Sequence, residues 1–249
     1  MQRLANIALA GLFGIAASAA GCSGDSATTG VTSTDSVPAV FGNFSSAVDV
    51  SRDGNYVVLH TTDIPDHKSP YFATSDSRYT AYSGSNANFV LNPNRIASQQ
   101  ITLRIPVTPA VATTHAATPG GVIGIAVNGV VIFNQYNGQA APLSNEINSF
   151  DQYNGHPQQS GVYHYHVEPT YITAAKGTDA LIGFLLDGFP LYGTYEGGKK
   201  IVNADLDTYH GHTGATKEYP GGIYHYHITS EDPYINGSGF YGTAGTVAQ

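Results

Sequence analysis

The stretch that decides the fold is "GVYHYHVEP" at residues 161–169, which recurs almost unchanged as "GIYHYHITS" at residues 222–230. Both copies begin with a glycine and are rich in β-branched and aromatic residues, so both are predicted to be strands. Side chains alternate along a strand, which places the two tyrosines of each copy on one face and the two histidines on the other. The histidines of one strand are then about 7 Å apart at Cα, close enough to bind one metal ion.

A larger segment surrounds each copy and is also repeated. "GIAVNGVVIFNQYNG" (124–138) corresponds to "GFLLDGFPLYGTYEG" (183–197), and each has the Asn-Gly or Asp-Gly pair of a tight hairpin. "DQYNGHPQQSGVYHYH" (151–166) corresponds to "DTYHGHTGATKEYPGGIYHYH" (207–227). Two independent motifs keep their order, which predicts an internal duplication with pseudo-two-fold symmetry. We place repeat A at about 122–169 and repeat B at about 181–230.

The composition favours a mainly β fold. The chain has 249 residues, of which 29 are glycine and 17 are tyrosine, while only 11% are charged. Short apolar runs bounded by turn residues predict strands, and helical periodicity is weak. We therefore expect short strands and hairpins with a few short helices, in a single domain at 40–245 whose N-terminal part is 40–119. The predicted strands are 55–60, 101–107, 121–127 and 130–133, and the predicted short helices are 142–150 and 202–209.

The N-terminus indicates export. Residues 1–21 have a short positive start followed by an apolar run, which is typical of a signal peptide. The run ends in Ala-Ala-Gly before Cys22, and this pattern predicts lipidation of Cys22 and anchoring in a bacterial cell envelope, periplasmic or at the outer surface. The alternative is an ordinary signal peptide with an incidental cysteine. Residues 22–39 are small and polar, as in a flexible tether.

The cysteine count and the net charge exclude some properties. Cys22 is the only cysteine, so the chain forms no internal disulfide. The net charge of −8 argues against nucleic acid as a partner, because an acidic surface is not attracted to phosphates.

Six histidines are the candidate metal ligands. Each His-x-His strand has a further histidine upstream, directly after a glycine. Three imidazoles per repeat suit zinc, copper or iron, at two separate sites or at one shared centre. A lone His-x-His is more often surface decoration or a hydrogen-bonding pair, but two copies with matching upstream histidines favour metal. The ligands expected from this pattern are His156, His164, His166, His212, His225 and His227.

Three acidic residues are candidates for supporting roles. Asp151 and Asp207 lie at matching positions before the Gly-His pairs, where they either orient metal ligands or cap turns. Glu168 follows His166 by two residues and is the candidate general base of a metalloenzyme. The second copy has Thr229 at that position, which argues against a symmetric catalytic role.

The paired "YHYH" strands, the Gly-His pairs and "LDGFPLYG" (186–193) together resemble the YHYH-domain family of secreted and membrane-attached bacterial proteins. "DIPDHKSPYF" (63–72) and "NPNRIASQQITLRIP" (92–106) are similar to N-terminal pieces of that family. The resemblance extends over about 56–241 and implies His67 as a seventh metal ligand. Members of the family often have cysteine where this chain has Tyr153 and Tyr209, and near Gly239.

Three functions remain open from the sequence. The first is a cell-envelope lipoprotein that binds a transition metal ion, copper or zinc before iron. The second is a metalloenzyme, a hydrolase or an oxidoreductase, that uses the same histidines. The third is an envelope module that binds a non-metal ligand or adheres to a surface. The chain has no Gly-x-Ser-x-Gly, His-Glu-x-x-His or Walker motif to indicate another chemistry.

Overall fold

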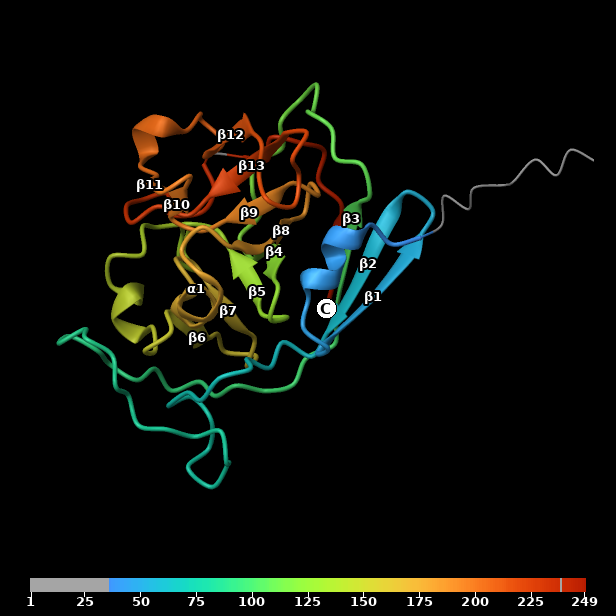
Figure 1. Cartoon of the computed structure of the whole chain (residues 1–249). Coiled ribbons are helices and arrows are strands. Elements are labelled where there is room, and N and C mark those ends of the chain that lie inside the picture. Colours follow the sequence, from blue (N-terminus) through green and yellow to red (C-terminus); the bar gives the residue numbers. More distant parts are fainter. Residues whose placement is uncertain (1–35, 238) are drawn as a thin grey trace, which may run out of the picture. The chain divides into compact units, whose positions relative to one another are not determined.

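An eight-stranded mixed sheet forms the centre of the fold (Figure 1). The computed structural model describes residues 36–249 except residue 238. The strands of this sheet, in the order in which they lie side by side, are β12 (Gly211–Gly214), β13 (Ile223–His227), β9 (Pro190–Tyr192), β8 (Leu181–Leu185), β4 (Val122–Ala126), β5 (Val131–Phe133), β7 (Tyr163–Tyr165) and β6 (Gly155–Pro157).

The two predicted repeats contribute four strands each, in opposite order across the sheet. Strands β4 and β8 are antiparallel neighbours at the middle, where Ile125 lies opposite Phe184. Outward from this pair, β5 and β9 complete the hairpins. Next come β7, which runs parallel to β5, and β13, which runs parallel to β9. The edge strands β6 and β12 run antiparallel to β7 and β13. The four strands of each predicted repeat thus occur in the same order from the centre to the edge, while the duplication and its symmetry stay predictions from the sequence.

The two central hairpins close at the turns expected from the sequence. Gly129 and Gly188 have φ values of 91° and 83°, which glycine adopts without strain. The preceding Asn128 and Asp187 accept hydrogen bonds from backbone N–H groups two residues later, and these bonds hold the turns.

A second, antiparallel sheet of four strands shares the hydrophobic core with the first. Its order is β1 (Val48–Asp53), β2 (Tyr56–Thr61), β3 (Ile101–Pro106) and β14 (Thr246–Ala248). Leu59 and Leu103 of this sheet are fully buried in the same apolar cluster as Phe184 of the large sheet. The joint burial of apolar side chains from both sheets stabilises the fold.

Helices are few and short, which confirms the mainly β class. The structure has η1 (Ala39–Asn43), η2 (Glu146–Ser149), α1 (Thr170–Lys176) and η3 (Asn203–Asp205). The expected helical segments 142–150 and 202–209 contain η2 and η3. Helix α1 was not expected, although Pro169 before it and Gly177 after it are typical boundary residues.

Most of the N-terminal predictions concern residues that the structure does not describe. The signal peptide, Cys22 and residues 22–35 of the expected tether are outside the described residues, and η1 already begins at Ala39. Within residues 36–249, leaving out 238, no helix has both the length and the apolar character needed to cross a bilayer.

Candidate metal sites

Each edge of the large sheet places three histidines side by side. In the ladder of β6 and β7, His156 lies directly opposite His164. In the ladder of β12 and β13, His212 lies directly opposite His225. Directly opposite residues of an antiparallel pair share a face, and so do residues two apart along a strand. The third histidine at each edge is His166 or His227, two residues after His164 or His225. It therefore lies on the same face as the other two, and the three form a triad.

A glutamate completes each triad, and the two resulting groups are the candidate metal sites. Site A consists of Glu146, His156, His164 and His166. Site B consists of Glu196, His212, His225 and His227. In each group the four potential ligand atoms all lie within 4.8 Å of one another.

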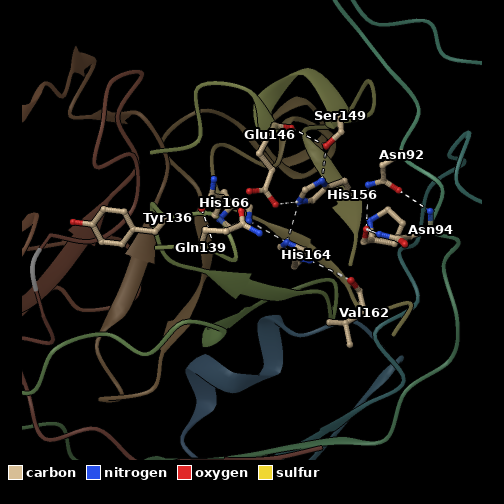
Figure 2. Close-up of polar contacts among 12 residues, drawn as sticks. Asn92, Asn94, Tyr136, Gln139, Glu146, Ser149, His156, Val162, His164 and His166 are labelled. Atoms are coloured by element: carbon tan, nitrogen blue, oxygen red, sulfur yellow. Dashed lines mark hydrogen bonds and ion pairs between the residues drawn. The ribbon is translucent and has the colours of Figure 1, made fainter. Parts of the chain in front are cut away.

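Site A brings its three imidazoles together at their Nε2 atoms (Figure 2). The Nε2 of His164 lies 3.0 Å from the Nε2 of His156 and 3.0 Å from the Nε2 of His166. A carboxylate oxygen of Glu146 lies 3.4 Å from the Nε2 of His156. Three rings and one carboxylate therefore point into one small volume.

Backbone carbonyls fix the tautomers of two of these rings. The Nδ1 of His164 lies 3.1 Å from the carbonyl oxygen of Val162, and the Nδ1 of His166 contacts the carbonyl oxygen of Asn134. A carbonyl oxygen can only accept a hydrogen bond, so both Nδ1 atoms carry a proton. In the neutral rings, the Nε2 atoms that face each other are then bare lone pairs.

Ser149 fixes the third ring of site A in the same way. Its hydroxyl donates to the carbonyl of Glu146 at 2.7 Å, and its oxygen lies 2.7 Å from the Nδ1 of His156. Because the hydroxyl proton is already used, the Nδ1 of His156 is the donor to Ser149. All three Nε2 atoms of site A are thus free to bind a cation.

Site B repeats this arrangement with a closer carboxylate. The Nε2 atoms of His212 and His225 are 3.0 Å apart, and the two oxygens of Glu196 lie 3.2 and 3.1 Å from them. The Nδ1 atoms of His225 and His227 donate to backbone carbonyls. The Nε2 of His227 is buried and has no hydrogen-bond partner among the described residues. A buried polar atom without a partner is costly unless a ligand satisfies it.

Burial keeps five of these imidazoles neutral. Removal from water lowers the pKa of His156 to about 3 and the pKa of His166 to about 4, and it lowers the pKa of His164 as well. In site B, burial lowers the pKa of His227 to about 4 and also lowers the pKa of His225. A neutral ring with a free lone pair is the form that binds a transition metal.

The geometry of each site fits a single ion. Lone pairs that face one another at 3.0 Å repel unless a proton or a cation lies between them. Two Nε2 atoms at that separation can both lie about 2.1 Å from one ion, with an angle of about 90° between the two bonds. Imidazole nitrogens held by carbonyls through their second nitrogen are typical of metal-binding histidines. The buried histidine and glutamate groups could therefore hold a metal ion, although which ion is not fixed by imidazole ligands alone.

The two sites are separate, which excludes one shared centre. The strands β7 and β13 are separated by five steps across the sheet, through β5, β4, β8 and β9. Neighbouring strands are about 4.8 Å apart, so the two His-x-His strands are about 24 Å apart along the sheet. An ion at one edge cannot be bound by the histidines of the other. The alternative of six imidazoles around one ion is wrong for this reason.

The glycine before the first histidine of each site makes room for a tyrosine ring. A Cβ atom at Gly155 would lie 2.3 Å from the ring of Tyr163, and one at Gly211 would lie 2.5 Å from the ring of Tyr224. The turn itself falls one residue earlier, at Asn154 and His210, whose φ values are 67° and 72°. The glycine of each Gly-His pair is thus explained by close packing against the tyrosine ring.

The structure places His67 outside both sites. Its Nε2 lies 3.2 Å from the hydroxyl of Tyr165 and its Nδ1 lies 3.2 Å from the carbonyl of Lys68. Its ring packs against the rings of Tyr153 and Tyr171, 4.5 and 5.1 Å away between centroids. Both nitrogens contact protein groups and His67 belongs to neither site, so its role as a seventh ligand stays a prediction from the family resemblance.

Asp151 and Asp207 bind tyrosine hydroxyls and close turns. The hydroxyl of Tyr163 donates to Asp151 at 2.8 Å, and the hydroxyl of Tyr224 donates to Asp207 at 2.9 Å. Each carboxylate also accepts the backbone N–H two residues later. Their hydrogen bonds, as far as the described residues show them, include no imidazole of site A or site B. Of the two roles considered from the sequence, turn capping is the one that these contacts match.

The glutamates of the sites were not found by sequence reasoning, which singled out Glu168 instead. Strand β7 ends at Tyr165, so Glu168 lies beyond it and belongs to neither site. It lines a cavity of about 470 Å³ together with Phe150 and Val167. The glutamate of site A comes from η2 and that of site B from β10 (Tyr195–Glu196). Glu196 lies in the repeated segment 183–197, but the matching residue of 124–138 is Asn137, so the repeat gives no glutamate at site A.

The comparison with known families identifies the chain. The family described as YHYH protein matches residues 102–201 and 199–239, more than half of the chain. The protein therefore belongs to the YHYH family, as its motifs indicate. All eight residues of sites A and B lie within the matched part, whereas residues 56–101 of the expected resemblance, His67 included, lie outside it. No curated protein and no solved structure matches the chain.

Proposed function

We propose that this protein is a cell-envelope lipoprotein that binds two transition-metal ions, one at site A and one at site B. The observation that supports this most strongly is the set of Nε2 atoms that face each other at 3.0 Å while their Nδ1 atoms donate to protein acceptors. Such rings cannot satisfy one another by hydrogen bonds, because no proton lies between the facing lone pairs. A metal ion at each site resolves this conflict.

Zinc and copper are the ions that we favour, with iron as the next choice. Imidazole and carboxylate together suit Zn²⁺ and Cu²⁺, and Cu²⁺ has the higher intrinsic affinity for such sites. The chain binds the ion without a thiolate, because its only cysteine is Cys22. The expected role of such binding is to store the ion in the envelope or to transfer it there.

The envelope location rests on the N-terminal sequence. Lipidation at Cys22 anchors the domain, and the polar stretch after it spaces the domain from the membrane. The chain with Cys22→Ser is expected to leave the membrane fraction and to lose labelling by a radioactive fatty acid. Labelling that persists in this variant contradicts the lipoprotein assignment.

Elemental analysis of the protein, purified in detergent without a histidine tag, tests the metal sites. We expect two ions per chain in the wild type and one in each of the double variants His164→Ala/His166→Ala and His225→Ala/His227→Ala. The exposed His60 serves as the matched control, since His60→Ala removes an imidazole that contacts Thr102 outside both sites. A wild type without zinc, copper or iron, and without a thermal shift when these ions are added, contradicts the proposal.

A further inference from the structure

The two sites differ in how their glutamates are held. Glu146 belongs to η2, where its own carbonyl binds Ser149, the residue that also holds His156. The neighbouring Ile147 packs with the buried Leu143 and Phe150. The carboxylate of site A is thus part of the same packed turn that orients one of its imidazoles.

The glutamate of site B is carried by a minimal hairpin. Strands β10 and β11 (Lys199–Lys200) form only two residue pairs, joined by Gly197 and Gly198 with φ values of 56° and 82°. A two-stranded hairpin of this size has little stability of its own. The ion pair between Lys199 and Asp205 ties it to η3. Backbone bonds from Tyr195 to Thr178 and from Ile201 to Thr194 hold the base of the hairpin, while the hydrogen bonds and ion pairs of the Glu196 carboxylate within the described residues go to the imidazoles of site B.

The two sites also differ in their access to solvent. In site B, the side chains of His212 and Glu196 are 28% and 32% exposed. In site A, the side chain of His156 is only 4% exposed and that of Glu146 is 25% exposed. Asn92 and Asn94 of the long loop between β2 and β3 bind the carbonyl of Pro157 and cover the edge strand that carries His156 (Figure 2).

We propose that site B exchanges its ion with chelating molecules in solution, through displacement of the β10–β11 hairpin that carries Glu196, whereas site A retains its ion. This inference rests on the proposed function, since it requires an ion at both sites. It assigns the two sites different roles. Site A stabilises the domain, and site B takes up and releases the metal from small-molecule or peptide chelators.

Release kinetics test this inference. The full chain in detergent is loaded with two Zn²⁺ per molecule and mixed with an excess of the chromogenic chelator 4-(2-pyridylazo)resorcinol. We expect two phases of equal amplitude whose rates differ at least tenfold. The fast phase is expected to vanish in His225→Ala/His227→Ala, and the slow phase in His164→Ala/His166→Ala.

A surface variant tests the hairpin without touching a ligand. Lys199→Ala removes the ion pair with Asp205 and is expected to speed the fast phase severalfold while the slow phase stays unchanged. Lys200→Ala, on the same exposed strand, is the matched control and is expected to change neither phase. Equal release rates from both sites, a slow phase that belongs to site B, or no effect of Lys199→Ala overturns the inference. A protein that binds none of zinc, copper and iron contradicts the proposed function itself.

Discussion

Site A and site B have the same imidazoles and different carboxylates. In both, a cross-strand histidine pair and a third histidine two residues along form a triad, because the same strand geometry recurs at the two edges of the sheet. Glu146 comes from a 3-10 helix and Glu196 from a hairpin, so the fourth group of each site comes from a different kind of element. The sheet therefore fixes the imidazoles, whereas the loops set how exposed each site is.

The faces of β7 and β13 that carry the tyrosines also differ from each other. Tyr163 and Tyr224 each donate to an aspartate, but Asp151 is buried and Asp207 is exposed. The hydroxyl of Tyr226 donates to the buried carboxylate of Asp187. The hydroxyl of the corresponding Tyr165 instead contacts the side chains of Asn128 and His67. The two halves therefore share hydrogen bonds whose surroundings, and hence whose energies, differ.

The largest effect is expected from emptying site A. In excess zinc, a site filled at 1,000 times its dissociation constant adds about 4 kcal/mol to the free energy of unfolding. For a domain of this size, that corresponds to a Tm about 8–16 °C higher. Differential scanning calorimetry should show that His164→Ala/His166→Ala loses this gain and falls below the site B double variant, because the rings of His164 and His166 also stack on Phe133 and Phe150. Equal Tm values for the two variants contradict the difference between the sites.

The second effect separates the two aspartate–tyrosine pairs. Tyr163→Phe leaves a buried carboxylate short of one donor and is expected to cost about 2 kcal/mol of stability. Tyr224→Phe leaves Asp207 free to bind water and is expected to cost less than about 1 kcal/mol. Urea unfolding of both variants measures the two costs. A larger loss for Tyr224→Phe contradicts the burial argument.

A third effect concerns pH and distinguishes Asp187 from Asn128, its neutral counterpart in the other hairpin. Burial raises the pKa of Asp187 from 3.8 to about 6. Between these values the folded chain keeps a proton that the unfolded chain has released. The free energy of unfolding therefore falls as pH rises through this window, by up to about 1.4 kcal/mol per pH unit from this group.

Urea titrations of the wild type and of Asp187→Asn between pH 4 and pH 6.5 measure this contribution. The asparagine does not titrate, so the variant should lack that downward component. Indistinguishable slopes for the two proteins show that Asp187 keeps an ordinary pKa.

The smallest effect on metal content is expected at His67. His67→Gln removes a ring that packs between tyrosines and should lower stability by about 1 kcal/mol, while the number of bound ions stays at two. Elemental analysis with calorimetry on one sample measures both quantities. Loss of an ion in this variant restores His67 as a ligand.

Much of the scaffold could be predicted because it depends on local rules. The Asn-Gly and Asp-Gly pairs predict tight turns from backbone conformation alone, and the alternation in "YHYH" predicts which residues share a face. The strands expected at 101–107 and 121–127 lie close to β3 and β4 as they occur.

The rest depends on contacts between distant segments. Glu146 and Glu196 have no periodic signal, since each enters its site only after a loop has closed over the sheet. His67 was assigned by a family motif, and a motif does not distinguish a packed ring from a ligand. Glu168 was proposed as a general base because it follows His166 by two residues, but strand β7 ends three residues before it.

An anomalous difference map from crystals grown with zinc or copper tests the central claim most directly. The account predicts two peaks per chain, each about 2.1 Å from the three Nε2 atoms of one triad. The two peaks should lie at opposite edges of the eight-stranded sheet, with a glutamate oxygen beside each. A single peak, peaks away from the triads, or no peak at all contradicts it.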